Sequence, residues 1–316
     1  MSVSYLITLY NKEEFIAGVV DAALAEQATT GGEVIIYDDV STDRSAIIVQ
    51  ERIAAHPAQA GVARLISGEK NRGVAFATNF LVDTASKPYT RLIDADDVLV
   101  KGSTSHLQRL LRQHNLGFIH GMTTEVGNYD YDLEKQPFTE CFVIVNPLRR
   151  ILRHAIAGAS TSLFETAVLR KALPLPEYKR RTQDFLITLR VANNNARMGY
   201  INDVVSIGPS DRTGNNLSAA LAAMFAEMSR DVALDGPGLP LAELRYASRR
   251  YAARTAKYFR RRGQSKLSPK EKLDLWRWQN LAWFASRQDC IARLTHTADL
   301  LDRDRDVMVT GPARPI

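Results

Sequence analysis

The sequence has few features of secreted, membrane-spanning or zinc-binding proteins. Its two cysteines, Cys141 and Cys290, lie far apart and outside any CxxC or Cys/His pattern, so two reduced thiols are expected. The six histidines form neither an HxxxH nor an HExxH pair, which argues against a histidine-rich zinc site. No uncharged apolar run reaches about 18 residues, the length that a transmembrane helix needs. Residues 1–7 lack the basic region and long apolar core of a secretory signal, so a cytoplasmic location is expected.

The charge of the chain is basic. It carries 41 lysines and arginines against 35 aspartates and glutamates, which gives a formal net charge of +6 and a pI of about 9.3. This charge suits an acidic partner, namely nucleotide phosphates, an anionic glycan, anionic lipid or nucleic acid, and the composition does not choose among them. With 316 residues and 45% hydrophobic content, the chain can form one large domain with an extension and a sizeable core.

Strand and helix patterns alternate over residues 3–97. Short apolar runs that end in polar turns predict strands, and apolar residues spaced by three and four predict helices. Such repeats indicate right-handed βαβ units, and hence an α/β fold with a Rossmann-like, mostly parallel sheet flanked by helices. The predicted strands are residues 3–8, 33–37, 63–66 and 89–93, and predicted helices follow the turns at 10–12, 41–43 and 71–73.

Polar side chains follow three of these strands. Thr8 and Tyr10 end the first strand, Asp38 and Asp39 follow the second, and residues 94–97 follow the fourth. Ligands of such sheets bind beyond the carboxyl ends of the strands. We therefore expect these groups to gather at one edge of the sheet and to form a single site.

The acidic block at residues 94–97 (DADD) places three carboxylates directly after a strand. Hard divalent ions prefer oxygen ligands, and Mg²⁺ often takes only one or two carboxylates together with substrate phosphates. A metal held there would act as a Lewis acid and neutralise charge on a departing diphosphate. Taken alone, the block is better explained as a solvated acidic turn, and only its position at the shared edge favours a metal site.

A second polar segment, residues 38–43 (DDVSTD), follows the second strand. A carboxylate just past a strand can accept a hydrogen bond from a nucleobase N–H, and we expect Asp39 to do so. The serine, threonine and aspartate that end the segment also form a good helix cap, which is the role expected of Asp43.

Four short motifs occur in order: residues 7–13 (ITLYNKE), 34–43 (VIIYDDVSTD), 71–73 (NRG) and 92–97 (LIDADD). Together they resemble the family 2 glycosyltransferases, whose pattern has a strand ending in YN, a DDxSTD segment, an NxG helix start and a DADD block. The resemblance is clear over residues 1–125 and looser to residue 218. It implies a GT-A fold and transfer of a sugar from a nucleotide sugar with inversion at the anomeric carbon.

The resemblance also implies which residues bind the nucleoside. Thr8 and Tyr10 would lie against it, and Asp39, beside Asp38, would pair with the base. The Gly73 region would approach the nucleotide closely, which a residue without a Cβ permits, although a simple helix entry is an equal alternative.

For the chemistry, the resemblance implies that Asp94 contacts the ribose or the sugar and that Asp96 holds Mn²⁺ or Mg²⁺. The family's acidic pair before a helix ending in LR is matched by RTQDFLITLR, in which Gln183 replaces the first acid. Asp184 would then be the base that takes a proton from the acceptor hydroxyl, with a helix cap as the alternative. The family's RxHxxxxS loop is matched by DRTGNNLS without its histidine, and Arg212 would contact the diphosphate or lie in a surface loop.

Beyond residue 218 the pattern is helical, so we expect a GT-A domain at 1–218 and a helical extension at 219–316. Residues 268–271 (SPKE) predict a helix start with a capping box. Residues 245–266 contain nine basic and no acidic side chains, which suits an anionic membrane surface. An acidic glycan, nucleic acid or a solvated face of a packed helix are alternatives. The aromatic residues that follow are expected in the core of this region: Trp276, Trp278, Trp283 and Phe284.

The sequence therefore predicts a metal-dependent inverting glycosyltransferase that uses a nucleotide diphosphate sugar, with UDP favoured, and a glycan or lipid-linked acceptor. Its expected role is bacterial polysaccharide or glycolipid assembly, in the cytoplasm or peripherally at the inner membrane face through Arg245–Lys266. A sugar nucleotidyltransferase is one alternative, but residues 7–12 do not form the glycine-rich phosphate loop expected of it. A non-catalytic protein that binds anionic membrane or nucleic acid through the basic segment is another. That alternative leaves the strand-end carboxylates without a purpose. Nucleic acid is the less favoured of the possible partners.

Overall fold

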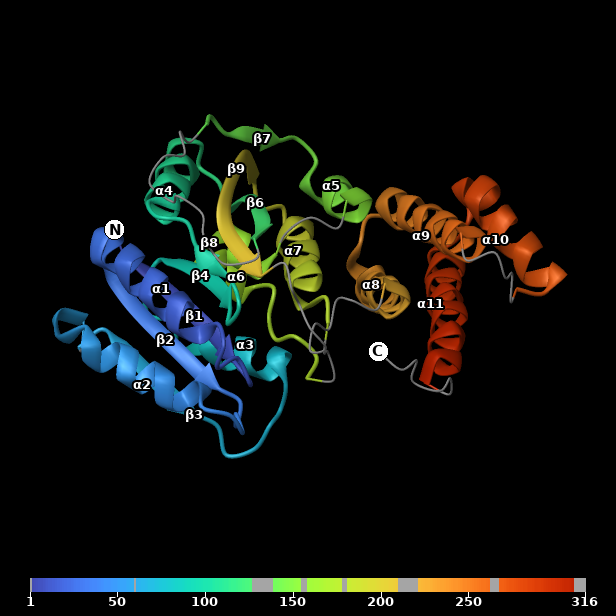
Figure 1. Cartoon of the computed structure of the whole chain (residues 1–316). Coiled ribbons are helices and arrows are strands. Elements are labelled where there is room, and N and C mark those ends of the chain that lie inside the picture. Colours follow the sequence, from blue (N-terminus) through green and yellow to red (C-terminus); the bar gives the residue numbers. More distant parts are fainter. Residues whose placement is uncertain are drawn as a thin grey trace. The chain divides into compact units, whose positions relative to one another are not determined.

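The computed structural model describes residues 2–59, 61–126, 139–154, 158–177, 181–209, 221–261 and 267–309. The chain divides into two compact units (Figure 1). Unit 1 comprises Met1–Ile151 and Ala155–Asn215, and unit 2 comprises Leu152–His154 and Asn216–Ile316. We propose that they correspond to the domain at 1–218 and the extension at 219–316.

The described part of unit 1 contains one nine-stranded sheet. Its strand order is β3-β2-β1-β4-β8-β6-β9-β5, and β7 pairs with β9. The first four strands of this order are parallel and the remainder are mixed, so the α/β fold is confirmed. The strands are β1 (Val3–Leu9), β2 (Gly32–Asp38), β3 (Ala63–Ser67), β4 (Tyr89–Asp94), β5 (Val98–Leu99), β6 (Phe118–Val126), β7 (Phe142–Ile144), β8 (Ser162–Glu165) and β9 (Met198–Pro209).

The strand order determines which face each helix covers. β1, β2 and β3 follow one another in one direction, so right-handed crossovers place α1 and α2 on the same face. The chain then returns to β4 on the other side of β1, which places α3 on the opposite face (Figure 1). The helices are α1 (Ile16–Thr30), α2 (Ser45–Ala55), α3 (Val74–Thr84), α4 (Ser103–Gln113), α5 (Pro147–His154), α6 (Thr166–Arg170) and α7 (Gln183–Asn193), with 3₁₀ turns η1 (Pro57–Gln59) and η2 (Ala159–Thr161).

β1 is the central strand of the parallel part and is buried on both faces. Tyr5, Leu6 and Ile7 are each fully buried, as expected of a parallel strand covered by helices on both sides. In register, Thr8 lies opposite both Tyr37 of β2 and Asp94 of β4. The carboxyl ends of the three strands therefore meet at one edge, which confirms the predicted convergence.

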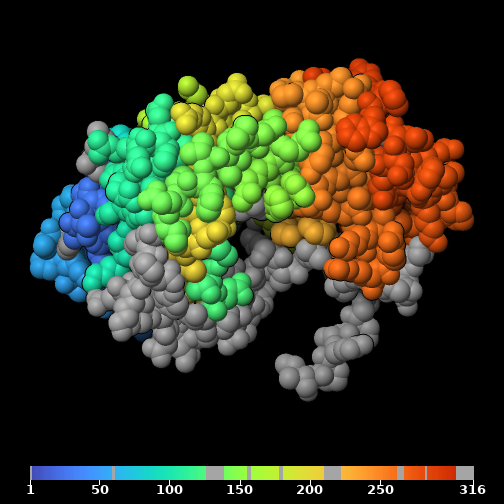
Figure 2. Space-filling model, turned by 90° about the horizontal axis from the view of Figure 1, so that it is seen from above, coloured from blue at the N-terminus to red at the C-terminus, as the bar shows by residue number. Residues whose placement is uncertain are grey.

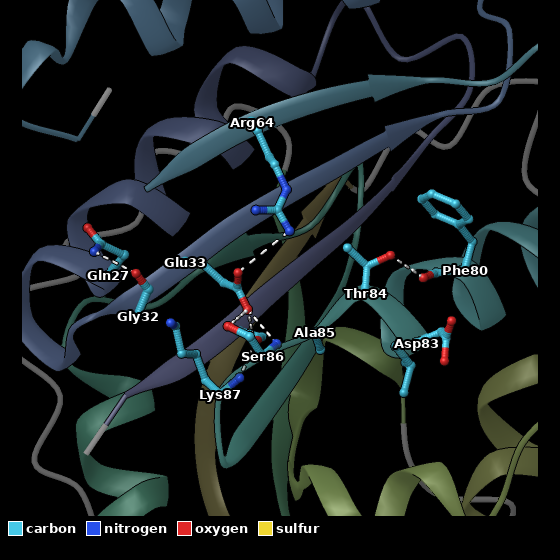
Figure 3. Close-up of polar contacts among 12 residues, drawn as sticks. Gln27, Gly32, Glu33, Arg64, Phe80, Asp83, Thr84, Ala85, Ser86 and Lys87 are labelled. Atoms are coloured by element: carbon cyan, nitrogen blue, oxygen red, sulfur yellow. Dashed lines mark hydrogen bonds and ion pairs between the residues drawn. The ribbon is translucent and has the colours of Figure 1, made fainter. Parts of the chain in front are cut away.

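The opposite edge of the parallel strands is tied together by Glu33 (Figure 3). Its Oε1 accepts hydrogen bonds from Ser4 Oγ at 2.7 Å and from Ser86 N and Oγ at 2.7 and 2.9 Å, while Arg64 lies 3.7 Å from Oε2. Burial raises the pKa of Glu33, but the hydrogen bonds from Ser4 and Ser86 and the charge of Lys87 outweigh it, so the pKa lies below its ordinary value of 4.5. One ionised carboxylate thus joins β1, β2, β3 and the loop before β4.

Unit 2 is helical, as predicted. α11 packs against α8 and α9, and α10 packs against α9. The predicted capping box is confirmed, because Ser268 N donates to Glu271 Oε2 at 2.7 Å and Glu271 N donates to Ser268 Oγ at 3.3 Å. None of the described helices is long and apolar enough to span a bilayer. The elements are α8 (Leu221–Asp235), η4 (Gly236–Gly238), α9 (Leu241–Arg261), α10 (Pro269–Leu281), η5 (Ala282–Phe284) and α11 (Arg287–Val309).

The expectation that the tryptophans and Phe284 form the core of this region was wrong for three of the four. Trp276 and Trp283 are 56% and 53% exposed, and Phe284 is 91% exposed. Trp278 alone packs against the buried cluster of unit 2, because it lies toward the side of α10 that carries the buried Leu275.

The basic side chains of α9 are largely engaged within unit 2. Four arginines donate to carbonyls in the last turns of α10 and α5 or just after η5, where backbone oxygens lack intrahelical partners. Lys257, Arg260 and Arg261 are exposed, and Arg262 and Lys266 lie outside the described residues. The four contacts, each 2.8–2.9 Å, are Arg245 to Ala285, Arg249 to Gln279, and both Arg250 and Arg254 to Arg153.

Candidate functional site at the carboxyl edge

The loops that follow β1 and β2 are interlocked by reciprocal hydrogen bonds. Asn11 has a left-handed backbone with φ 50°, which turns the chain sharply after the strand. Asn11 N donates to Ser41 Oγ at 3.0 Å, and Asn11 Oδ1 accepts from Thr42 N at 2.8 Å. Lys12 N donates to Ser45 Oγ at 2.7 Å. The YN and DDxSTD motifs are therefore two halves of one rigid structure.

Asp38 and Asp39 stabilise different loops. Asp38 Oδ1 accepts from Ser41 N and Oγ at 3.1 and 2.5 Å, which fixes the turn after β2. Asp39 Oδ1 accepts from Arg72 N at 2.9 Å and Oδ2 from Gly73 N at 2.7 Å. Asp39 is 3% exposed and thus holds the start of α3 against the end of β2. Its base-pairing role stays a prediction, and any base would have to share these oxygens with two backbone N–H groups.

Gly73 is required for its backbone conformation. Its φ is +86°, a region that residues with a Cβ rarely adopt. A Cβ built on this residue would meet nothing within 4 Å, so packing does not exclude a side chain here. The turn brings two consecutive N–H groups onto Asp39, and the space beside it is compatible with close approach of a ligand.

Asp43 binds the first N–H of α2 from one residue before the N-cap position, which is Arg44. Its Oδ1 accepts from Ser45 N at 2.9 Å, and its Oδ2 accepts from Glu13 N at 3.1 Å. Burial raises the pKa of Asp43, but the hydrogen bonds from Ser45 and Glu13 lower it by a larger amount, so the pKa lies below its ordinary value.

The acidic block follows β4 at the same edge. Asp94 N donates to Ser160 Oγ at 3.0 Å, and Asp97 N closes the turn onto the carbonyl of Asp94 at 3.0 Å. Asp96 Oδ2 forms an ion pair with Lys12 Nζ at 2.7 Å, with the two side chains 17% and 23% exposed. Lys12 thereby joins the β1 loop to the acidic block, a role that the sequence analysis missed.

The Asp96 carboxylate is suited to a hard cation. It is partly exposed, lies at the ligand-binding edge and already binds an ammonium group at 2.7 Å. Within the described ranges, no group of three or more His, Cys, Asp or Glu side chains is arranged to hold a metal ion. A divalent ion at Asp96 would therefore need phosphate oxygens to complete its ligands, as Mg²⁺ commonly does.

Arg91 is a buried cation beneath the acidic block. It lies on β4 three residues before Asp94 and is fully buried. Burial lowers the pKa of Arg91, and the charge of Glu26 opposes this change. One of its contacts is the carbonyl of Ser160, whose hydroxyl binds Asp94 N, so Arg91 supports the backbone of the site. Its donors reach Ser103 Oγ (2.9 Å), Thr104 Oγ1 (2.6 Å), Ser160 O (3.2 Å) and Val205 O (2.8 Å).

Thr8 and Tyr10 lie at the carboxyl end of β1. Thr8 is half-buried and lies in register with Asp94, and Tyr10, just past the end of β1, is 47% exposed. An exposed aromatic ring at the end of the central parallel strand can stack on a planar base. Their contact with a nucleoside stays a prediction.

Asp184 lies at the start of α7, in unit 1. Its Oδ1 accepts from the N–H of Phe185 at 2.8 Å, which is the helix-start role named as the alternative. The segment before α7 runs along α3, because Leu175 and Asn79 exchange two hydrogen bonds of 2.8–2.9 Å. Glu177 also binds Arg72 at 2.7 Å, next to Gly73. These contacts place Leu175 and Glu177 beside α3 and the residue before Gly73, and Arg212 lies outside the described residues.

Comparison with known proteins identifies the family. The family model "Glycosyl transferase family 2" matches residues 4–169, more than half of the 316-residue chain, so the chain belongs to this family. The match includes the four motifs and the acidic block.

Curated relatives agree with this assignment. The succinoglycan biosynthesis protein ExoU of Rhizobium meliloti is 31% identical over 213 residues, which are 63% of this chain and 59% of that protein. The chain spans less than two thirds of the length of the curated relatives it matches, and only 22% of a teichoic acid poly(glycerol phosphate) polymerase from Staphylococcus epidermidis, with 30% identity over 52% of this chain.

Solved structures share the fold. Staphylococcus aureus TarS 1–349 in complex with UDP-GlcNAc superposes with a TM-score of 0.64 at 21% identity, covering 96% of this chain and 92% of that one. A mannosyltransferase from Pyrobaculum calidifontis, in complex with GDP-Man and Mn²⁺, gives a TM-score of 0.52 at 16% identity, covering 98% and 81%. The predicted GT-A fold with a helical C-terminal region is therefore confirmed.

Proposed function

We propose that the protein is a glycosyltransferase that moves a sugar from a nucleoside diphosphate sugar to an acceptor hydroxyl. The observation that carries the proposal is the joining of four strand-end loops at one edge of the sheet. Asn11 and Lys12 bind the β2 loop, Asp39 binds the start of α3, and Lys12 binds Asp96. Membership of family 2 supports a glycosyl-transfer reaction at this edge.

In this proposal, the donor lies across the carboxyl ends of β1, β2 and β4. Tyr10 and Thr8 contact the nucleoside, and Asp39 accepts from the base N–H through lone pairs that the backbone leaves available. Asp38 keeps the β2 turn in place, and Asp94 contacts the ribose or sugar. UDP is the favoured nucleotide, and the complex of the structurally similar TarS with UDP-GlcNAc supports it.

The transfer is a single displacement. Asp184 accepts the proton of the acceptor hydroxyl while that oxygen bonds to the anomeric carbon. The bond from the anomeric carbon to the diphosphate oxygen breaks, and the diphosphate leaves with the electron pair. The configuration at the anomeric carbon is thereby inverted. Arg212 would bind the leaving diphosphate through bidentate hydrogen bonds.

A divalent ion, Mn²⁺ or Mg²⁺, would be held by Asp96 and would supply charge neutralisation at the diphosphate. The partial exposure of Asp96 and its affinity for the Lys12 ammonium suit this role. The complex of a structurally similar mannosyltransferase with Mn²⁺ supports the choice of ion.

The acceptor is proposed to be a glycan or a lipid-linked glycan in bacterial polysaccharide or glycolipid assembly, which the name of the related ExoU supports. A sugar nucleotidyltransferase is disfavoured by family membership. A contact of Arg245–Lys266 with anionic membrane is disfavoured by the four arginines that bind helix ends.

Calorimetry with UDP, with and without Mn²⁺, tests the donor site. Metal-dependent UDP binding is expected, and Asp96→Ala should abolish the metal dependence while Asp83→Ala, an acidic residue of α3, should not. UDP binding that is identical in Asp96→Ala would refute the metal assignment.

Hydrolysis of a panel of nucleotide sugars then identifies the donor. Asp184→Asn should bind UDP with unchanged affinity and fail to transfer sugar, because the amide cannot accept the proton. Retained turnover in that variant would exclude Asp184 as the base, and hydrolysis of no sugar nucleotide by the wild type would refute the proposed reaction.

A further inference from the structure

The large exposed apolar side chains of unit 2 are concentrated in one short segment of the chain, α10 and η5. Six such side chains are exposed in the described part of this unit, and five of them lie between residues 273 and 284; the sixth is Leu234 on α8. Singly scattered apolar residues are ordinary on a surface, but five within twelve residues of the chain point to an interaction site. We call this group the aromatic face: Leu273 (45% exposed), Trp276 (56%), Leu281 (56%), Trp283 (53%) and Phe284 (91%).

Three exposed basic side chains accompany the aromatic face, together with the half-exposed Asp274 and the exposed Asp289. Lys270, Lys272 and Arg277 are exposed on α10 and share its outward side with Leu273 and Trp276 at helical spacing. Both acidic residues of the helix are only half-exposed, and one of them, Glu271, is bound to Arg303 of α11 at 2.6 Å. The hydrogen bond from Arg303 lowers the pKa of Glu271 to about 2.

The aromatic face is held in place rather than left on a loose segment. The Arg249 guanidinium stacks 3.9 Å from the ring of Trp283 and donates to the carbonyl of Gln279. Arg245 donates to the carbonyl of Ala285, directly after η5. The basic residues of α9 thus position α10 and η5, and the space-filling view shows the dark-orange atoms of this segment on the visible surface of unit 2 (Figure 2).

The mixture of tryptophan, phenylalanine, leucine and lysine matches the interface of a bilayer. Tryptophan rings prefer the headgroup level, and a helix with apolar residues on one side and basic residues beside them lies in the interfacial plane. Anionic lipid headgroups would complement the three basic residues. A second copy of this chain fits less well, because a two-fold contact through the same surface would bring Lys270, Lys272 and Arg277 against their equivalents.

We propose that α10 and η5 form a peripheral contact surface for an anionic membrane. The aromatic face enters the boundary between headgroups and acyl chains, and Lys270, Lys272 and Arg277 bind lipid phosphates. This surface takes the place of Arg245–Lys266 as the membrane contact, and it does not depend on which sugar the protein transfers.

Tryptophan fluorescence gives a direct test, since all three tryptophans of the chain, Trp276, Trp278 and Trp283, lie in this segment. The full chain is mixed with phosphatidylcholine vesicles, with and without phosphatidylglycerol, and binding is measured by sedimentation. With the anionic vesicles, the emission should shift to shorter wavelength, and lipids brominated on the acyl chains should quench it. No binding to anionic vesicles, or binding without a spectral change, would overturn the proposal.

Two pairs of variants identify the contact. Phe284→Ser should weaken vesicle partitioning by about tenfold, because the variant lacks the ring that would enter the apolar part of the bilayer. Leu234→Ser on α8 should leave the partitioning unchanged. The triple reversal of Lys270, Lys272 and Arg277 to Glu should abolish sedimentation with anionic vesicles, since each basic group near the surface contributes about fivefold in affinity. The same reversal of the exposed α9 residues Lys257, Arg260 and Arg261 serves as the matched control.

Each remaining outcome is also decisive. If the α9 reversal removes binding and the α10 reversal does not, the membrane contact lies on α9 and the proposal is wrong. Should wild type ignore vesicles but dimerise in sedimentation equilibrium, with Phe284→Ser monomeric, the aromatic face binds a second copy instead. Because the substituted side chains are exposed, circular dichroism and thermal melting of all four variants should match the wild type.

Discussion

Replacement of Arg91 by methionine should destabilise unit 1 strongly and loosen the acidic block. Methionine has a similar length and no charge, so the change removes the guanidinium with little change in volume. Four acceptors lose a donor, including the carbonyl of Ser160 at 3.2 Å and that of Val205 at 2.8 Å. Glu26, which is 2% exposed and accepts from Gly102 N and Thr104 N, loses the cation that opposes its charge.

The expected loss of stability follows from the burial of Arg91 and Glu26. Removal of one partner from a buried charge network costs about 3–5 kcal/mol, because the remaining groups stay desolvated. That is a large part of the about 5–15 kcal/mol that stabilises a typical domain. With a urea m value of about 2–3 kcal/mol/M, the unfolding midpoint should fall by about 1–2.5 M. Arg91→Lys keeps the charge and loses the planar fork of donors, so it should lose about half as much.

Urea unfolding followed by circular dichroism measures these differences, and a double-mutant cycle with Glu26→Gln tests their cause. If Glu26 is the counter-charge of Arg91, the double variant should lose about 1–3 kcal/mol less stability than the two single variants lose together. Since Ser160 links Arg91 to the backbone of Asp94, Arg91→Lys should also weaken UDP binding. An Arg91→Met variant within about 0.5 kcal/mol of wild type, or strictly additive losses, would refute this account of the buried arginine.

Three other substitutions test separate parts of the site and the sheet. Lys12→Met should tighten the apparent affinity for Mn²⁺ in the presence of UDP by up to about fivefold, because a partly exposed ion pair with Asp96 contributes up to about 1 kcal/mol; weaker Mn²⁺ binding in calorimetry would contradict it. Asp39→Asn should cost about 1–2 kcal/mol in urea unfolding, because one of the two oxygens that hold the turn before α3 becomes an N–H₂ group, and unchanged stability would speak against this role. Glu33→Gln should cost about 1–3 kcal/mol at neutral pH. Because the folded-state pKa of Glu33 is depressed, its contribution is present above the unfolded pKa near 4.5 and is lost as the pH falls through the folded pKa, so the gap between variant and wild type should close in acid; a gap that does not change with pH would contradict the assignment.

The elements that were predicted have a clear local sequence pattern, and the elements that were missed do not. The strands at 3–8, 33–37, 63–66 and 89–93 were located to within one residue, because burial on both faces gives continuous apolar runs. α4 and β6 were not predicted at all. β6 is irregular, with register shifts against β9 after His120 and again after Met122, which obscure a simple periodicity.

The candidate site shows the same division. Its location at the carboxyl edge could be predicted, since parallel strands with helical crossovers leave only one edge for ligands. The partners of its residues could not, because they come from distant parts of the chain. Lys12 and Asp96 are 84 residues apart, and Asp39 and Gly73 are 34 apart. One signal that could have been used was Arg91, because an arginine within a predicted buried strand needs buried polar partners.

By itself, the sequence determined the family, the βαβ order, the edge that carries the site and the capping box of α10, because each depends on neighbouring residues or on a motif of fixed spacing. Tertiary structure alone decided what each charged or aromatic side chain faces. The arginines of α9 bind helix ends. Trp276, Trp283 and Phe284 are exposed, although tryptophan and phenylalanine are residue types typical of a core. Burial depends on which other helix covers a face, and α9 covers only one side of α10.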